Sequence, residues 1–228
     1  KKDARTVVAE QFRALRTNIQ FMLTDDDEKT ILITSSMSGE GKSFISINLA
    51  STLALSGKKV ILLELDLRKP KVAYHLQLNN QAGFSNYVIG KANLDDVIVS
   101  SGVVERFDVM PSGPVPPNPA ELIMLPKTEQ LITDLKTKYD YIVIDTAPIG
   151  LVTDAQLLAK SADAVIYILR QGYTYYEQLK SADELYRSGK IKHMGMLIND
   201  VELKRGNAYG YGKYGSGYYD QTNTESTM

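Results

Sequence analysis

The fold is decided by Ser35-Ser36-Met37-Ser38-Gly39-Glu40-Gly41-Lys42-Ser43, which joins an apolar stretch, residues 30–34, to a helical pattern that starts near Gly41. This strand-loop-helix order is the context in which a glycine-rich loop binds phosphate. Successive backbone N–H groups surround the β-phosphate, and the positive end of the following helix points at the same charge. Lys42 is expected to reach the β- and γ-phosphate oxygens, and the Ser43 hydroxyl to ligate Mg²⁺. The sequence therefore predicts a nucleoside triphosphate site.

The loop departs from the common pattern at one position. The G-x-x-x-x-G-K-[ST] pattern would place glycine at position 36, where this chain has Ser36. A Gly-Lys-Ser turn that merely caps a helix is the alternative explanation, but the strand-loop-helix context favours a phosphate loop. The residues expected to hold the nucleotide are Ser38, Gly39, Glu40, Gly41, Lys42, Ser43 and Phe44.

Length and composition restrict the remaining possibilities. The chain has 228 residues, which fits a single α/β domain with a continuous core. Its 26 basic and 27 acidic residues nearly balance, which gives no argument for nucleic acid as a partner. Cysteine is absent, so disulfides and thiolate chemistry are excluded, and no apolar run approaches the roughly 20 residues that span a bilayer. We expect a soluble domain, and a start at Lys1 without methionine suggests a fragment of a longer protein.

Strand and helix patterns alternate along most of the chain. Near-continuous apolar strands between helices predict a mainly parallel sheet covered by helices on both faces, an α/β fold with three layers. The last helix is predicted to open with a capping box formed by Thr174 and Glu177. The predicted strands are residues 31–34, 60–65, 107–110, 141–144, 164–169 and 194–198, and the predicted helices are residues 7–23, 42–56, 128–138, 153–160 and 174–188.

Two further strands end in acidic residues. One runs into Glu64 and Asp66, and the other ends at Asp145. Ligands of parallel sheets bind beyond the carboxyl ends of the strands, so these acids are expected beside the phosphate loop. A strand-terminal aspartate near such a loop holds Mg²⁺ directly or through water, and Asp145 is our predicted partner of the metal. A buried acid that caps a helix or pairs with a base is the alternative.

These segments together resemble the bacterial tyrosine kinases (BY-kinases) of capsule and exopolysaccharide synthesis. The resemblance rests on the loop, on Glu-Leu-Asp-Leu-Arg-Lys-Pro at 64–70, on the strand at 142–148 and on Gly-Pro-Val-Pro-Pro-Asn-Pro-Ala-Glu-Leu at 113–122. It extends from about Glu10 to the C-terminus. Three positions depart from the family pattern: Ser36, Glu64 in place of aspartate, and Ala147 in an Asp-x-Pro-Pro ending.

The resemblance implies an ATP-dependent, non-specific protein-tyrosine kinase on a P-loop scaffold related to the MinD and ParA ATPases. It implies that Lys42, Asp66 and Arg68 act in catalysis, with Asp66 orienting or deprotonating the tyrosine hydroxyl. Asn199 is similar to the asparagine that reads adenine in this superfamily, although a turn before Asp200 also explains it. The cofactors are ATP and Mg²⁺, and the implied metal environment consists of Ser43, Glu64, Asp66 and Asp145.

The C-terminal segment, residues 207–228, is rich in tyrosine and glycine and has no apolar periodicity, so we expect a flexible tail after a kinase domain at residues 1–206. A disordered aromatic tail without function is the alternative. The family resemblance favours autophosphorylation, in trans, at Tyr209, Tyr211, Tyr214, Tyr218 and Tyr219.

Near the N-terminus, Glu10, Arg13 and Arg16 resemble the family's E-x-x-R-x-x-R assembly motif, although a solvated helix face also explains this spacing. The resemblance implies a ring of identical subunits in which each tail enters a neighbouring active site. It also implies a transmembrane polysaccharide co-polymerase region, fused or partnered, a cognate phosphotyrosine phosphatase, and a place at the cytoplasmic face of the membrane. A MinD- or ParA-like ATPase switch is the first competing interpretation, which Met37 disfavours because those proteins usually have lysine there. A non-catalytic nucleotide-binding regulator is the second.

Overall fold

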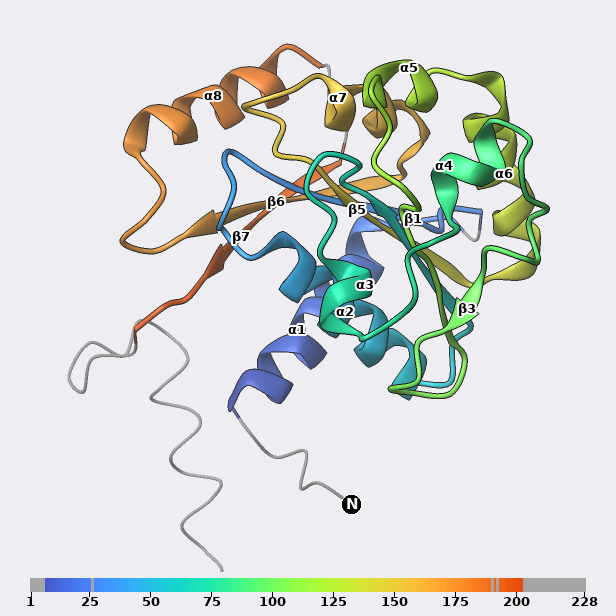
Figure 1. The fold of residues 1–228 in the computed structure, drawn as a ribbon. Coiled ribbons are helices and arrows are strands. Elements are labelled where there is room, and N and C mark those ends of the chain that lie inside the picture. Colours follow the sequence, from blue (N-terminus) through green and yellow to red (C-terminus); the bar gives the residue numbers. More distant parts are fainter. Residues whose placement is uncertain (1–6, 26, 190, 192, 203–228) are drawn as a thin grey trace, which may run out of the picture.

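The computed structural model describes residues 7–25, 27–189, 191 and 193–202 (Figure 1). Within these residues, seven strands form one sheet in the order β3-β4-β2-β5-β1-β6-β7. All neighbouring strands are parallel except β3, which runs antiparallel to β4. The strands are β1 (Thr30–Ser35), β2 (Val60–Leu65), β3 (Val99–Ser100), β4 (Phe107–Met110), β5 (Tyr141–Thr146), β6 (Ala164–Arg170) and β7 (Met194–Asn199).

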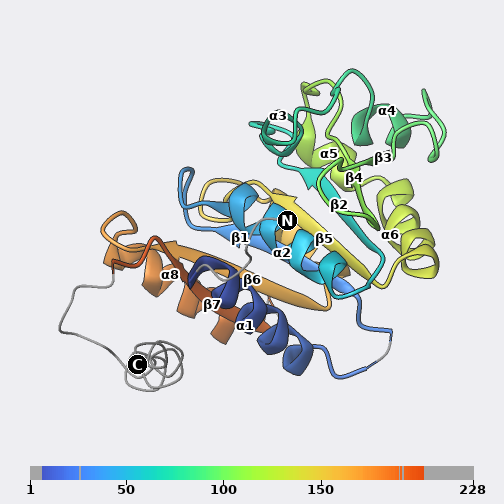
Figure 2. The ribbon, with the colours of Figure 1, turned by 90° about the horizontal axis from the view of Figure 1, so that it is seen from below.

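Helices cover both faces of this sheet. On one face lie α1 (Val7–Met22), α2 (Lys42–Leu55) and α3 (Val72–His75), and Figure 2 shows α1 and α2 side by side against the sheet. On the other face lie α4 (Phe84–Val88), α5 (Pro119–Ile123), α6 (Pro126–Lys138), α7 (Asp154–Leu158), the 3₁₀ helix η1 (Ala159–Ser161) and α8 (Tyr176–Arg187). The predicted three-layer α/β architecture is therefore confirmed.

Alternation along the central strands builds two hydrophobic cores. In β1, Ile31 and Ile33 face α1 and α2 and pack in the same cluster as Leu49, whereas Leu32 joins Leu131 in the cluster beneath α4 to α8. Every residue of β1 and β2 is buried, because each of these strands has a neighbour on both sides and helices above and below. Two-sided burial is the reason why these strands read as near-continuous apolar runs.

The parallel strands place their carboxyl ends along one edge of the sheet. β1 leads into the loop at 36–41, and β2 and β5 end on one side of this loop. β2 and β5 pair in parallel, with Glu64 opposite Asp145. β6 and β7 end on the other side, at Arg170 and Asn199. The edge therefore brings the phosphate loop, the acidic strand ends and the last residues of β7 into one row.

Most predicted elements are confirmed, with local corrections. The helix predicted at 153–160 is a shorter α7 followed by a 3₁₀ turn, and the sequence patterns missed α3, α4 and β3. The capping box predicted at Thr174 and Glu177 is wrong, because α8 begins at Tyr176 and the Gln178 side chain accepts the Tyr175 N–H. Among the described residues, no helix is long and apolar enough to cross a membrane. The proposed boundary after residue 206 lies outside the described residues.

Candidate nucleotide site at the carboxyl edge of the sheet

The phosphate loop needs glycine at two positions. Gly39 has φ 91° and Gly41 has φ 102°, a left-handed backbone that residues with a Cβ rarely adopt. Space is restricted as well: a Cβ on Gly39 would lie 2.8 Å from the Tyr173 hydroxyl, and one on Gly41 would collide with the Asn199 side-chain amide. The two glycines therefore allow both the curl of the loop and its close contact with the ends of β6 and β7.

Glu40 turns its side chain into the protein. It is fully buried, and its carboxylate accepts hydrogen bonds from the Ser36 hydroxyl at 2.6 Å and from the Met37 N–H at 2.8 Å. The Thr174 hydroxyl, which precedes α8, also donates to this carboxylate. These bonds give a physical reason for serine at position 36, where the common pattern has glycine, and they engage Thr174, the residue that was expected to cap α8.

Three consecutive carbonyls of the loop accept hydrogen bonds from side chains at the ends of β6 and β7. The Tyr173 hydroxyl donates to Ser38 O at 2.8 Å, and Arg170 Nη1 donates to Gly39 O at 3.0 Å. Asn199 Nδ2 donates to Glu40 O at 2.9 Å. Asn199 thus lies beside the phosphate loop, and its predicted role in reading adenine stays a prediction. The contacts of all three residues with the loop were not anticipated.

Lys42 is buried at the first residue of α2. Burial lowers the pKa of its ammonium group, and the negative charges of Asp145, Asp66 and Glu40 oppose that shift. The structure therefore brings the predicted catalytic lysine close to two of the predicted acids, Asp66 and Asp145.

Asp145 and Ser43 are in direct contact. The Ser43 hydroxyl donates to Asp145 Oδ2 at 2.7 Å, and the Ser46 hydroxyl lies 3.1 Å from Oδ1. Burial raises the pKa of Asp145 to about 7, although the Ser43 hydrogen bond and the charge of Lys42 act in the opposite direction. Among the described residues, at this site and elsewhere, no group of three or more His, Cys, Asp or Glu residues could hold a metal ion. Any Mg²⁺ here would need oxygens from the nucleotide or water as well.

Glu64 is engaged by the backbone. Its Oε1 accepts from the N–H groups of Val72 and Ala73 at 2.5 and 3.3 Å, and its Oε2 accepts from the Ser112 N–H at 3.1 Å. The side chain is fully buried and ties the start of α3 to the segment after β4. These bonds give Glu64 a bracing role, and its part in binding Mg²⁺ stays a prediction.

Asp66 and Arg68 follow β2 and have different surroundings. Asp66 is 8% exposed, and its Oδ1 accepts the Lys69 N–H at 3.0 Å. Arg68 forms a two-pronged ion pair with Asp154, with Nε to Oδ2 at 2.9 Å and Nη2 to Oδ1 at 3.1 Å. This hydrogen bonding raises the pKa of Arg68 above its ordinary value. Sequence reasoning missed Asp154, because an acid in the first turn of a helix is also explained by the helix dipole.

The residues predicted for assembly lie on α1. Glu10 and Arg13 form an ion pair one turn apart, and Arg16 is half-buried on the same helix. Phe12, between these charges in the sequence, is buried and contacts the Phe44 ring edge-to-face at a centroid distance of 6.0 Å. Phe44, predicted to contact nucleotide, is itself half exposed in the first turn of α2. The predicted phosphoacceptors Tyr209, Tyr211, Tyr214, Tyr218 and Tyr219 lie outside the described residues.

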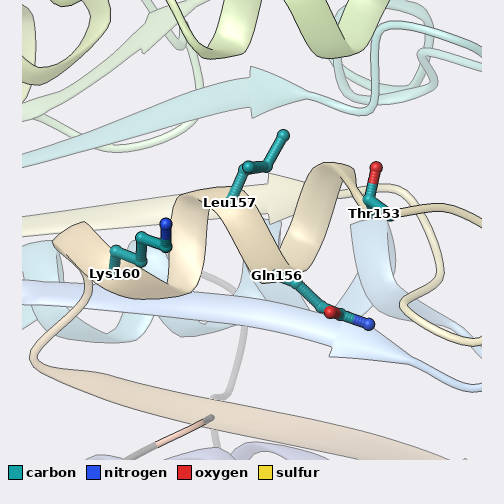
Figure 3. Close-up of a pocket in the computed structure, with 4 residues that line it drawn as sticks. All are labelled: Thr153, Gln156, Leu157 and Lys160. Atoms are coloured by element: carbon teal, nitrogen blue, oxygen red, sulfur yellow. The ribbon is translucent and has the colours of Figure 1, made fainter.

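A separate hollow of about 320 Å³ lies along α7 and is lined by Thr153, Gln156, Leu157 and Lys160 (Figure 3). It includes none of the phosphate-loop residues or strand-terminal acids, so it is not part of the candidate nucleotide site.

Comparisons with known proteins identify relatives of this chain by sequence and by fold. The AAA domain family matches residues 28–184. The chain is 37% identical over 209 residues to the tyrosine-protein kinase YwqD of Bacillus subtilis, which covers 92% of this chain and 88% of that protein. The solved kinase domain of the Escherichia coli tyrosine kinase ETK superposes with a TM-score of 0.85 at 30% identity and covers 92% of this chain and 82% of that chain.

A more distant likeness concerns the fold alone. The septum site-determining protein MinD of Pyrococcus horikoshii, solved with Mg-ADP, gives a TM-score of 0.62 at 24% identity and covers 75% of this chain and 69% of that chain. The sheet and the phosphate loop therefore follow a fold that MinD shares.

Proposed function

The chain belongs to the bacterial tyrosine-protein kinase family, and we propose that it transfers the γ-phosphoryl group of ATP to protein tyrosine hydroxyls. The observation that carries this proposal is the position of Lys42, which is buried in the field of Asp145, Asp66 and Glu40 at the carboxyl edge of the sheet. Phosphoryl transfer depends on such a placement of charges, because it requires mainly positioning and electrostatic stabilisation of the transferred group.

The loop residues fit the phosphates of a nucleotide. Gly39 and Gly41 keep the loop free of Cβ atoms at its tightest points, and α2 begins at Lys42 with its positive end at the loop. Ser43 and Asp145 offer adjacent oxygen ligands of the kind that Mg²⁺ prefers, and Asp66 and Glu64 add negative charge nearby. When bound, Mg²⁺ would supply positive charge that offsets the negative charge of the phosphates.

In this proposal Asp66 is the general base. Its Oδ1 is held by the Lys69 N–H, whereas its Oδ2 accepts no hydrogen bond from any described residue. As the tyrosine oxygen attacks the γ-phosphorus, its proton passes to the Asp66 carboxylate and the bond to the ADP oxygen breaks. The Lys42 ammonium offsets the charge on the transferred group. Asp154 accepts hydrogen bonds from Nε and Nη2 of Arg68. We propose that the other N–H donors of Arg68 contact phosphate.

We place the acceptors in the C-terminal tail, at the five tyrosines from Tyr209 to Tyr219. β7 ends at the same edge as the phosphate loop, and its last residue, Asn199, contacts that loop. Four strand spacings separate β7 from β2, about 19 Å, and ten extended residues reach at most about 35 Å. Tail length alone therefore permits transfer within one subunit. Delivery in trans rests on a ring assembled through Glu10, Arg13 and Arg16.

The cellular setting follows from the same family membership. We propose that the domain works at the cytoplasmic face of the membrane, with a transmembrane polysaccharide co-polymerase region and a phosphotyrosine phosphatase as partners. In Etk of Escherichia coli the matched part is 28% of that protein, so there the kinase segment is one part of a longer chain. YwqD, in contrast, is covered over 88% of its length. These two lengths show that the matched segment makes up most of one relative and a minor part of another, and we propose that the additional part of the longer protein includes the membrane region.

The test uses the purified chain with ATP and Mg²⁺, followed by a phosphotyrosine blot and a phosphate-release assay. If the protein is a kinase, we expect phosphotyrosine that depends on ATP and that the substitution Lys42→Met abolishes. Phosphate release without phosphotyrosine would instead indicate an ATPase switch of the MinD type, and nucleotide binding without either would indicate a regulatory module.

A second experiment decides between cis and trans. Lys42→Met carries the tail but no activity, and a variant with phenylalanine at all five tail tyrosines carries activity but no acceptor. Phosphotyrosine on the Lys42→Met chain after mixing shows transfer between subunits. Its absence, with wild type active, overturns delivery in trans.

A further inference from the structure

We propose that Arg170, Tyr173 and Asn199 form a clamp that holds the phosphate loop in its phosphate-binding shape before any nucleotide arrives. This proposal rests on the proposed function, because that function identifies the ligand of the loop as a nucleotide. It assigns these three residues a role as positioning residues, which act through the loop and not on the reacting atoms.

The argument begins with the geometry of the peptide bond. In a planar trans peptide, the C=O and the following N–H point in opposite directions. The clamp binds the carbonyls of Ser38, Gly39 and Glu40 from the side of β6 and β7. The N–H groups of the next residues, Gly39, Glu40 and Gly41, are therefore turned away from the clamp. Three consecutive N–H groups on one side of a loop form the anion-binding concavity that a phosphate needs.

The clamp is itself held in place. Asp200, the first residue after β7, accepts Arg170 Nε at 3.0 Å and Arg170 Nη2 at 2.9 Å, which leaves Nη1 directed at the loop. The Arg170 guanidinium also lies 5.2 Å from the centroid of the Tyr173 ring. The ends of β6 and β7 therefore act on the loop as one unit.

Close packing makes the contact specific to this loop. Gly39 approaches the Tyr173 hydroxyl, and Gly41 approaches the Asn199 amide, too closely for a Cβ at either position. Glu40, between them, anchors its own side chain on Ser36 and Thr174. The loop is thus fixed through its backbone carbonyls on one side and through the Glu40 side chain in the interior, and none of these contacts uses the N–H groups of Gly39, Glu40 and Gly41.

The clamp contributes to loop geometry more than to global stability. Arg170 and Tyr173 are 38% and 40% exposed, and exposed ion pairs and hydrogen bonds stabilise a fold only slightly. The substitutions Arg170→Gln and Tyr173→Phe each remove one donor to the loop and should leave the protein folded. Arg187→Gln and Tyr186→Phe are the matched controls, because both lie on the exposed side of α8, where Arg187 pairs only with Asp183 among the described residues.

The first measurement is the backbone ¹⁵N order parameter of Gly39, Glu40 and Gly41 in the nucleotide-free protein. We expect values near about 0.85 in wild type and in the controls, and values that fall toward about 0.6 in both clamp variants. The second is the dissociation constant for ADP, which should rise about two- to tenfold in each clamp variant, as expected for one lost hydrogen bond. In kinase assays the KM for ATP should rise while kcat at saturating ATP stays within about twofold.

Unchanged order parameters together with unchanged ADP affinity in both clamp variants would overturn the proposal. The order parameters of the nucleotide-free loop test the clamp independently of the kinase proposal, because they do not depend on phosphotransfer. If the loop loosens in the variants but wild type makes no phosphotyrosine, the clamp stands and the kinase proposal falls. If wild type is an active kinase and the variants leave the loop and the ADP affinity unchanged, the clamp alone falls.

Discussion

Arg68 and Asp154 join the end of β2 to the start of α7 through a two-pronged ion pair in which the carboxylate is fully buried and the arginine side chain is 42% exposed. The pair connects the strand that carries the proposed base to the segment that follows Asp145. Its two members lie in different solvent environments, so their removal should have different consequences.

Arg68→Ala should destabilise the protein more than Asp154→Ala. The first substitution leaves a buried carboxylate without its partner, at a cost of roughly 2–3 kcal/mol, whereas the second leaves an arginine that water can solvate, at about 1 kcal/mol. Urea denaturation gives both free energies of unfolding. The double variant should resemble Asp154→Ala, and equal losses for the two single variants would contradict the difference in burial.

Asp66→Asn should keep ADP binding and lose most phosphotransfer. A positioned general base contributes about 10²- to 10⁴-fold to the rate, and asparagine preserves the shape of the side chain. The measurements are kcat for tyrosine phosphorylation and the dissociation constant for ADP. Asp134→Asn, on the exposed part of α6, is a control of the same chemistry. If Asp66→Asn keeps near wild-type kinase activity, Asp66 is structural.

Binding of Mg²⁺ with ADP should strengthen as pH rises through about 7 and level off at higher pH. Burial raises the pKa of Asp145 to about 7, and only the ionised carboxylate binds a metal well. Calorimetry at about pH 7 in two buffers of different ionisation enthalpy should therefore detect proton release. The terminal phosphate of ADP also titrates near this pH, so Asp145→Asn should reduce the release and not abolish it. Equal proton release in wild type and in Asp145→Asn would contradict the prediction.

The raised pKa of Asp145 also determines how this residue changes the free energy of unfolding with pH. The folded pKa of Asp145 lies above the ordinary value of 3.8, so the folded protein favours its protonated form. The contribution of Asp145 to the free energy of unfolding is therefore largest below about pH 4 and declines as pH rises to about 7. Asp145→Asn should remove this decline in the protein without metal.

Phenylalanine at all five tail tyrosines should remove nearly all self-phosphorylation and spare activity on an added tyrosine substrate. Tyrosines of the folded body are poorer acceptors: Tyr139 donates to Asp108 at 2.9 Å, and burial raises the pKa of Tyr167 to about 12. Tyr74 and Tyr176, which are 80% and 67% exposed, serve as controls for accessible body tyrosines. Mass spectrometry that places most phosphate on Tyr139, Tyr141 or Tyr167 would refute the assignment.

Alanine at Glu10, Arg13 and Arg16 should give a smaller species in light scattering and slower autophosphorylation. Alanine favours the helix, and the exposed Glu10–Arg13 pair contributes little to folding, so α1 should persist. The matched control is alanine at Asp183 and Arg187, an exposed ion pair on α8. Identical masses and rates for the triple variant and wild type would leave the assembly proposal without support.

Local sequence pattern was enough to predict six of the seven strands and to place the phosphate loop, because both depend on short-range order. The apolar run at 60–65 and the loop at 35–43 each contain their own signal. Two-sided burial of β1 and β2 then follows from the alternation of strands and helices, since crossover helices cover both faces of a parallel sheet.

Contacts between distant segments were out of reach of that reasoning. Tyr173 and Asn199 meet the loop across 135 and 159 residues of sequence, and Arg68 meets Asp154 across 86. The same limit explains the wrong capping box, because Thr174 has the local features of a cap and yet donates to Glu40. Donor side chains clustered at the ends of neighbouring parallel strands were the available signal for the clamp.

The position of the end of β7 has a consequence for the competition between acceptors. β7 ends at Asn199, which contacts the phosphate loop, so the flexible tail that the sequence predicts would present its first tyrosines to its own site at an effective concentration of order millimolar. For transfer in trans, the tyrosines of a neighbouring subunit's tail have to compete with this effective concentration of the subunit's own tyrosines. Assembly into a ring would therefore act by orientation, with each tail turned outward, more than by raising the amount of acceptor.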